Sequence, residues 1–161
     1  MSHGPMEGAA PISYRDHVHK EWVDYNGHMS EAYYVLVFGY ATDAFYDWIG
    51  MGDAYRRRES RSVYTLESHI TYLHEIGEGE ELAVRTQVLG ADHKRVCLFH
   101  AMHHGEQGEL LATSELMLLH VDMTGPRAVP FAPEVQARLE KIAAAHADVP
   151  RPVQAGRSIS L

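Results

Sequence analysis

The stretch from residue 30 to residue 49 constrains the fold most, because it is apolar on almost every side. It reads SEAYYVLVFGYATDAFYDWI, with apolar side chains recurring at helical spacing and tyrosines widening the apolar stripe. A helix that is apolar nearly all round is normally buried. Its length would suffice to span a bilayer, but Asp43 and Asp47 argue against that interpretation. The stretch therefore predicts a central core helix around which the rest of the chain packs.

Three polar side chains alternate directly before this helix, namely Asp24, Asn26 and His28. Ser30 suits the N-cap position, where its hydroxyl would accept a backbone N–H of the first turn, and Gly50 would end the helix. The N-terminus of a helix carries free N–H groups and partial positive charge. The polar cluster therefore adjoins a place that can hold a carbonyl oxygen as it becomes an oxyanion.

The second half of the chain is predicted to consist mostly of strands. Alternation of period two, interrupted by short glycine-containing turns, predicts strands at residues 62–74, 81–89, 96–104 and 110–121, after a first strand at residues 12–23. Residues 133–147 are expected to form a closing amphipathic helix with a proline in its first turn.

The strand expected at residues 62–74 carries ionisable side chains inside an apolar run. Alternation places Tyr64 and Tyr72 on one face and Glu67 with His69 on the other. Two neighbouring ionisable groups in such a strand either face water or line a pocket, and the residues alone leave both interpretations open.

A buried helix and five or six antiparallel strands place the chain in the α+β class, with the sheet wrapped around the helix. A single curved sheet leaves an open edge, and open edges must be paired or protected. We therefore expect a homodimer or a dimer of dimers. We expect one domain at residues 11–147, a flexible tail at residues 1–10, and a C-terminal tail at residues 148–161 that docks through Ile159 and Leu161.

Composition narrows the range of partners. The chain has 161 residues, enough for one domain with a core, and a net charge of −8, which disfavours nucleic acid. The N-terminus shows no apolar leader, so a cytoplasmic location without a membrane partner is expected. His17 and His19 could bind a metal ion, but no third ligand is evident. Neither a metal nor a cofactor is therefore expected.

The motif D-Y-N-G-H-M at residues 24–29, with the tyrosine-rich helix behind it, resembles the active-site loop and central helix of hotdog-fold thioesterases of the 4-hydroxybenzoyl-CoA type. It is most similar to the betainyl-CoA thioesterases of carnitine breakdown, in which this motif occurs together with a strand like E-S-H-I, here residues 67–70. The resemblance covers residues 12–147 in element order. Plant acyl-carrier-protein thioesterases share D-x-N-x-H, but Thr71 takes the place of their catalytic acid, so their full residue set is not carried over.

The resemblance implies hydrolysis of an acyl-CoA thioester, with Asp24 as general base or nucleophile. Asn26 would orient water or the carboxylate, Gly27 would allow close approach of the backbone, and His28 would support the oxyanion or proton transfer. Backbone N–H groups around Ser30 and its successor would complete the oxyanion hole. The sequence contains no G-x-S-x-G motif for a serine nucleophile. From the residues alone, an ordinary Asp/Asn-Gly turn is the more common explanation of this motif.

Two further sets of residues are expected to contact the substrate. The acyl and thioester end is assigned to Gly27, Met29, Ser30, Glu31, Tyr34, Trp48, Glu67 and His69. The CoA phosphates are assigned to Arg56, Arg57, Arg58, Arg61, Lys94 and Arg95, because arginine forks match phosphate geometry. The basic cluster could also be a solvated loop or short helix, and aromatic residues at helical spacing also fill cores.

The expected function is an acyl-CoA thioesterase that acts on a short acyl-CoA such as betainyl-CoA. A cationic acyl group is favoured because quaternary ammonium groups bind aromatic faces and are attracted by carboxylates. A general short-chain or aromatic acyl-CoA thioesterase is one alternative. A non-catalytic hotdog module that binds an acyl ligand is another, because a fold does not fix a function.

Overall fold

The computed structural model describes residues 10–105 and 108–161, so nearly all of the tail predicted at residues 1–10 lies outside the described residues. The elements in chain order are β1 (Ile12–His17), the 3-10 helix η1 (Lys20–Trp22), α1 (Glu31–Trp48), α2 (Asp53–Glu59), β2 (Arg61–Tyr72), β3 (Glu81–Ala91), β4 (Arg95–His104), β5 (Leu110–Asp122), β6 (Arg127–Ala128) and α3 (Pro133–His146). None of the described helices is long and apolar enough to cross a membrane.

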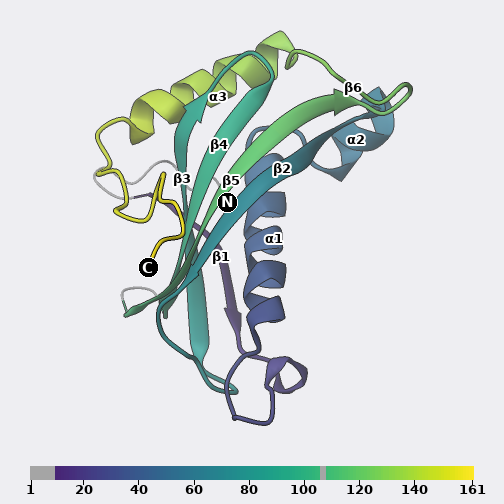
Figure 1. Ribbon diagram of the computed structural model, residues 1–161. Coiled ribbons are helices and arrows are strands. Elements are labelled where there is room, and N and C mark those ends of the chain that lie inside the picture. The colour runs from purple at the N-terminus through teal and green to yellow at the C-terminus, as the bar shows by residue number, and fades with distance from the viewer. Residues whose placement is uncertain (1–9, 106–107) are drawn as a thin grey trace.

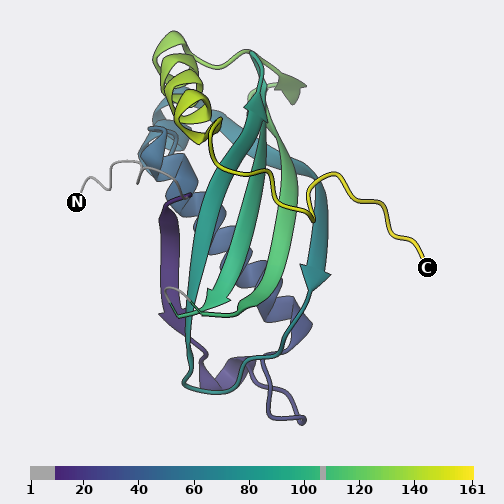
Figure 2. The ribbon, with the colours of Figure 1, turned by 90° about the vertical axis from the view of Figure 1, so that its left-hand side faces the viewer.

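The strands form one antiparallel sheet in the order β1-β3-β4-β5-β2, with the short β6 paired to β5. The sheet curls around α1, which lies along one of its faces, while α3 closes one end of the molecule (Figure 1). Figure 2 shows the same arrangement from the side, with α1 behind the strands. The predicted α+β architecture, a sheet wrapped around a long central helix, is confirmed.

The helix α1 is buried along one stripe, as its sequence predicts. Tyr34, Phe38 and Phe45 are at most 4% exposed, and they pack into two clusters of buried apolar residues between α1 and the strands. The helix ends at Trp48 with Ile49 as its C-cap, and Gly50 follows with a φ of +80°, the left-handed conformation that glycine adopts at low cost. The two clusters therefore hold both halves of α1 against the sheet.

A buried histidine joins α1 to the sheet. His100 on β4 is 0% exposed; its Nδ1 lies 2.8 Å from Thr86 Oγ1 on β3, and its Nε2 lies 2.9 Å from Thr42 Oγ1 on α1. Its ring stacks on Phe38. Burial lowers the pKa of His100 to about 3, because a charged imidazolium is disfavoured away from water. The imidazole is therefore neutral at neutral pH and satisfies both of its nitrogens inside the core.

Two local predictions are wrong. The first strand ends at His17 rather than at residue 23, because the chain turns through η1 before the motif. Ser30 occupies the N-cap position of α1, but its hydroxyl makes no capping hydrogen bond. The Ser30 carbonyl instead accepts the Tyr33 amide at 3.0 Å, a tight turn that opens the helix without help from the side chain.

A bulge in β2 changes which side chains share a face. The register between β2 and β5 shifts between Thr65 and Glu67, so one residue of β2 is left over in the pairing. Tyr64 therefore lies on the same face as Glu67 and His69, and Tyr72 lies on the face toward α1. The strict alternation predicted for this strand, with Tyr64 beside Tyr72, is wrong because the extra residue reverses the sides.

The C-terminal tail crosses the face of the sheet that points away from α1 (Figure 2). Gln87 Nε2 donates to the Val149 carbonyl at 3.3 Å, and the Gly156 amide donates to a Glu115 carboxylate oxygen at 2.6 Å. Ile159 is 93% exposed and Leu161 is also fully exposed. The tail therefore lies against the sheet through polar contacts, and not through the apolar side chains that the sequence suggested.

Candidate functional site

The motif forms a tight hairpin at the N-terminus of α1. Val23 and Met29 pair as an antiparallel bridge, and the Asp24 amide donates to the His28 carbonyl at 3.0 Å. The Gly27 amide donates to the Asp24 carbonyl at 3.0 Å, and Gly27 has a φ of +81°. Only glycine adopts that conformation readily, so the glycine of the motif is explained by the turn itself.

Asp24 lies at the base of this hairpin and is half-buried, whereas the side chains of Asn26 and His28 are exposed. Asp24 Oδ1 accepts a hydrogen bond from the Asn26 amide at 2.8 Å, which fixes the direction of the carboxylate. This Asx turn is the structural role that the bare sequence allowed. The same contact holds the carboxylate in one orientation, which a general base or nucleophile requires.

The first amides of α1 define where an oxyanion could lie. The Ser30 amide already donates to the Trp22 carbonyl at 2.9 Å, and the Met29 amide donates to the Ile76 carbonyl at 2.8 Å. The Ser30 amide is thus engaged, in contrast to its predicted role as an oxyanion donor. Glu31 and Ala32 open the helix, and amides at these positions have no intrahelical acceptor. These two N–H groups are the better candidates.

The turn between β2 and β3 lies beside the motif, although the predicted site contains none of its residues. His28 pairs with Gly77 in an isolated bridge, and the Gly77 amide donates to a Glu80 carboxylate oxygen. Glu80 also lies 3.1 Å from His104 Nε2. The pKa of Glu80 is lowered, first by the Gly77 hydrogen bond and then by His104. The contact between motif and turn is long-range in sequence, so no local signal could have revealed it.

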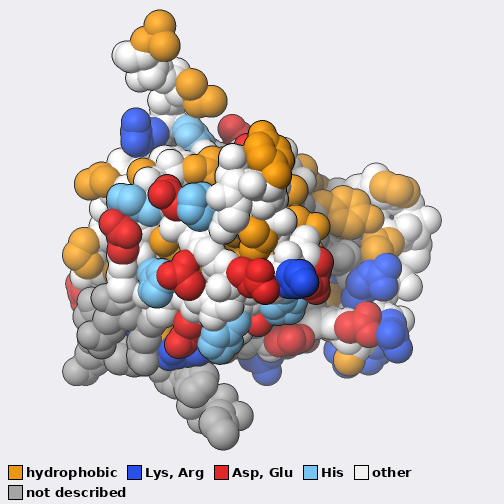
Figure 3. All heavy atoms as spheres, turned by 90° about the horizontal axis from the view of Figure 1, so that it is seen from below, with side chains coloured by type: hydrophobic (Ala, Val, Ile, Leu, Met, Phe, Trp, Pro, Cys, Tyr) orange, Lys and Arg blue, Asp and Glu red, His pale blue; other side chains and the backbone are white. Residues whose placement is uncertain are grey.

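Histidines and acidic residues alternate over this end of the molecule (Figure 3). Besides the Glu80 pair, His19 lies 3.0 Å from Asp16 and His74 lies 3.1 Å from Glu109. The pKa of His19 is raised, chiefly by its hydrogen bond to Asp16. The surroundings of the motif are therefore rich in carboxylates and suit a positively charged group better than a negatively charged one.

Two tyrosines meet at a right angle next to the first turn of α1. The rings of Tyr34 and Tyr72 lie 5.4 Å apart at 85°. The Tyr72 hydroxyl donates to the Glu31 carbonyl at 3.4 Å, and the Tyr34 hydroxyl donates to the His74 carbonyl at 3.2 Å. Burial raises the pKa of both phenols, and negative charge adds to it, from Glu75 at Tyr34 and from Glu31 at Tyr72. Tyr34 and Glu31 were predicted site residues, whereas Glu75 was missing from the predicted set.

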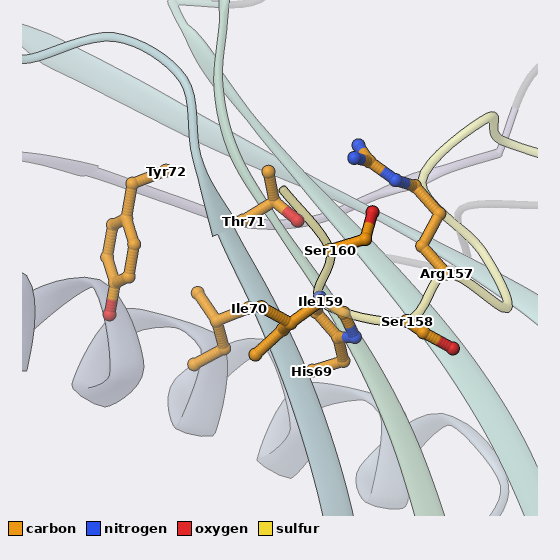
Figure 4. Close-up of a pocket in the computed structure, with 8 residues that line it drawn as sticks. All are labelled: His69, Ile70, Thr71, Tyr72, Arg157, Ser158, Ile159 and Ser160. Atoms are coloured by element: carbon orange, nitrogen blue, oxygen red, sulfur yellow. The ribbon is translucent and has the colours of Figure 1, made fainter.

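Three predicted substrate residues lie elsewhere in the chain. Glu67 and His69 are on the face of β2 that points away from α1, opposite Tyr72, as the predicted alternation has them. His69 lines a pocket of about 260 Å³ between β2 and the C-terminal tail, with Tyr72 at its margin (Figure 4). Trp48 is at the far end of α1, about 25 Å from Glu31 at 1.5 Å per residue. Within one chain, the structure does not bring these three side chains to Asp24.

The predicted phosphate contacts are also remote from the motif. Arg56, Arg57 and Arg58 lie on α2, at the C-terminal end of α1, and are exposed (Figure 1). Arg57 pairs with Asp53 at 2.7 Å and Arg58 with Glu59 at 2.7 Å, whereas Arg61 begins β2. Lys94 and Arg95 lie where β3 turns into β4, and Arg95 pairs with Asp92 at 2.7 Å. Among residues 10–105 and 108–161, no three side chains of His, Cys, Asp or Glu are placed to hold a metal ion.

Proteins named as thioesterases are similar to this chain over most of its length. The chain is 49% identical over 149 residues to a protein of Pseudomonas aeruginosa named betainyl-CoA thioesterase, covering 92% of this chain and 94% of the relative. It is 39% identical to a Rhizobium meliloti protein named L-carnitine dehydrogenase/betainyl-CoA thioesterase, covering 96% of this chain but only 31% of that longer relative.

Solved structures show the same fold. A crystal structure from Pseudomonas putida matches with a TM-score of 0.82 and 44% identity, covering 94% of this chain and 97% of the other. A Staphylococcus aureus protein in complex with CoA matches with a TM-score of 0.88 and 25% identity, covering 95% and 97%. The profile of the Thioesterase-like superfamily matches residues 18–139, and the chain therefore belongs to this superfamily and has the hotdog fold.

Proposed function

We propose that the protein hydrolyses the thioester of a short acyl-CoA to the free acid and CoA. The observation that carries this proposal is the hairpin that orients the Asp24 carboxylate and leads directly into the open N-terminus of α1. An oriented carboxylate and two free amides at the start of the following helix are the two groups that thioester hydrolysis needs, a base or nucleophile and an oxyanion site. The relative named betainyl-CoA thioesterase is similar over nearly the whole chain, which supports the same activity here.

The Asp24 carboxylate and the first amides of α1 are sufficient to describe the proposed reaction. The thioester carbonyl oxygen would accept hydrogen bonds from the amides of Glu31 and Ala32, and the helix dipole would stabilise the developing negative charge. Asp24 would take a proton from water as the water oxygen adds to the carbonyl carbon, or its own oxygen would add first and water would then release the acid. In both routes the carbon–sulfur bond breaks and the CoA thiolate leaves, to be protonated by Asp24, His28 or water.

The acyl group we propose is small and cationic, such as the betainyl group. Carboxylates surround the motif, and an aromatic corner adjoins the first turn of α1. A neutral short-chain or aromatic acyl group is the second candidate, because apolar residues also line this end.

Whatever the acyl group, the CoA phosphates need basic groups. The exposed arginines of α2 remain the candidates. The predicted cytoplasmic location stays a prediction.

The experiment that tests this function measures thiol release from a panel of acyl-CoAs by the purified protein. The panel contains betainyl-CoA, acetyl-CoA, butyryl-CoA and benzoyl-CoA. We expect release from betainyl-CoA to be the fastest. The fastest release from butyryl-CoA or benzoyl-CoA would instead assign the protein as a general acyl-CoA thioesterase. Binding of acyl-CoA without any thiol release would assign it as a non-catalytic module.

We also propose that the protein is a homodimer. Within the described part of the chain, β2 hydrogen-bonds to β5 along one side, and its other side is the edge of the sheet. Large apolar side chains on this strand are exposed, with Tyr64 at 45% and Leu66 at 57%. A long, exposed and apolar edge strand pairs readily with another chain. A dimer of dimers would be compatible with the same edge.

Sedimentation equilibrium across a dilution series checks this assembly. We expect a species of twice the 18.1 kDa chain mass to persist down to the concentrations at which activity is measured. A stable species of 18.1 kDa that retains full thiol-release activity on dilution would show that the monomer is the active unit.

A further inference from the structure

We propose that the right-angled corner of Tyr34 and Tyr72, together with the carboxylates of Glu31 and Glu75, is the subsite that recognises a quaternary ammonium group on the acyl chain. This inference rests on the proposed thioesterase function and adds to it the residues that select the substrate. The inference selects one group of aromatic side chains as the ammonium subsite, whereas the composition alone would allow several.

A distance constraint in the substrate decides where such a subsite must lie. In a betainyl thioester the ammonium nitrogen is two bonds from the carbonyl carbon, so the two atoms are about 2.5 Å apart, as in the N–Cα–C unit of a peptide. With the carbonyl oxygen on the amides of Glu31 and Ala32, the ammonium group must adjoin the first turn of α1. Any aromatic group farther away can contact only the CoA portion.

The constraint excludes the aromatic residues at the other end of the molecule. Trp48 is 17 positions from Glu31 on the same helix, which separates them by about 25 Å. Tyr64 is eight positions from Tyr72 along β2, which amounts to about 26 Å, and the bulge turns it to the opposite face. Neither residue can reach a group that lies within a few ångströms of the carbonyl carbon.

Tyr25 in the hairpin is 98% exposed but offers only a single ring, whereas two groups of packed rings remain at the correct end and only one of these groups is open. The Trp22 ring stacks on His19 at 4.0 Å and on Tyr33 at 5.8 Å, and Trp22 is only 5% exposed. Its ring faces are therefore occupied by other rings. In the second group Tyr34 is buried at 4% exposure, whereas Tyr72 is 46% exposed and offers an accessible ring beside the helix terminus.

The accessible corner is held in place and lies in a negative environment. The Tyr72 hydroxyl is anchored on the backbone carbonyl of Glu31, and the Tyr34 hydroxyl on that of His74, so both rings are fixed before a ligand arrives. The Glu31 carboxylate lies close enough to Tyr72, and the Glu75 carboxylate close enough to Tyr34, for its negative charge to help raise the pKa of that phenol. A quaternary ammonium group cannot donate a hydrogen bond, so ring faces and nearby negative charge are the interactions that can recognise it.

The test compares betainyl-CoA with 3,3-dimethylbutyryl-CoA, the neutral analogue in which carbon replaces nitrogen. The readout is the ratio of the two kcat/KM values, which a general loss of activity does not change. We expect wild type to prefer betainyl-CoA by about tenfold or more, the size of one or two cation–π contacts. Tyr72→Leu should reduce the ratio by about tenfold and Glu31→Gln by several-fold, because each removes one attraction for the charge.

Two control variants test whether the Tyr72 ring and the Glu31 charge are the features that matter. Tyr72→Phe keeps the ring and should retain the preference. Asp43→Asn neutralises an exposed carboxylate on the same helix, about 18 Å from Glu31, and should leave the ratio unchanged. If Tyr72→Leu does not fold, Glu31→Gln decides, because that side chain is exposed.

The outcomes separate this inference from the proposed function. Hydrolysis of betainyl-CoA with an unchanged ratio in both Tyr72→Leu and Glu31→Gln would overturn the subsite and leave the thioesterase function standing. Equal use of the two substrates by wild type would also overturn the subsite. Absence of thiol release from every acyl-CoA would overturn the function itself, and the subsite with it.

Discussion

Replacement of Asp24 by asparagine is expected to lower kcat for acyl-CoA hydrolysis by about 10²–10⁴-fold, the contribution typical of a positioned base. The amide side chain has the same shape as the carboxylate and can still accept the Asn26 amide through its oxygen, so the hairpin should be retained. What is lost is the negative charge that takes a proton or attacks the carbonyl carbon. Steady-state thiol release, with the substrate concentration varied, measures kcat and KM separately.

The effect of Asp24→Asn can be compared with that of a substitution at His28 in the same motif. His28→Ala should cost less than Asp24→Asn if His28 only supports the oxyanion or the leaving group. Urea unfolding of both variants should give midpoints close to that of wild type, because both positions lie on the hairpin and outside the buried core. An Asp24→Asn protein that is folded and retains activity within a few-fold of wild type would remove Asp24 from the mechanism.

Acidification from about pH 7.5 to about pH 5 is expected to lower the free energy of unfolding, with His100 alone contributing about 2 kcal/mol of the loss. The pKa of His100 is lowered to about 3 by burial in the folded protein, whereas an unfolded histidine titrates near 6.5. Between these values the unfolded chain binds a proton that the folded chain excludes. The stability contribution is therefore present above about pH 6.5 and is lost as the pH falls.

Two variants separate the effect of protonating His100 from the effect of losing its hydrogen bond to Thr42. His100→Gln removes the ionisable group, so its pH-dependent loss of stability should be about 2 kcal/mol smaller than that of wild type. Thr42→Val removes the hydroxyl that His100 Nε2 meets but keeps the imidazole buried, so it should be less stable at every pH with an unchanged pH dependence. Guanidinium unfolding at several pH values gives both quantities. An identical pH dependence in His100→Gln and wild type would show that His100 is not the group responsible.

The elements of the fold could be predicted because local patterns determine them. The apolar stripe of α1 is visible at helical spacing, and the helix found at Glu31–Trp48 differs from the predicted range by about one residue at each end. The glycine-containing turns likewise mark where β3, β4 and β5 separate. These signals arise from neighbouring residues, and a single sequence contains them in full.

Contacts between distant parts of the chain could not be predicted in this way. The bulge in β2 depends on the register with β5, and it places Tyr64 on the side of Glu67 and His69 instead of the side of Tyr72. The Ser30 amide is satisfied by the Trp22 carbonyl, so it is removed from the predicted oxyanion donors. The pairing of Tyr72 with Tyr34 joins β2 to α1, and neither position alone indicates that the two rings meet. In each case the environment of the group depends on a contact between residues that are distant in sequence, and not on local secondary-structure propensity.

The most direct test of the central claim is the rate at which the purified wild-type protein releases CoA from betainyl-CoA. A reaction with a cognate substrate should give a kcat/KM of about 10⁴ M⁻¹s⁻¹ or higher, with one molecule of betaine formed for each thiol released. In water enriched in oxygen-18, the new carboxylate oxygen of betaine should carry the label. A rate no higher than that of the uncatalysed hydrolysis, or one that Asp24→Asn leaves unchanged, would contradict the assignment of this site.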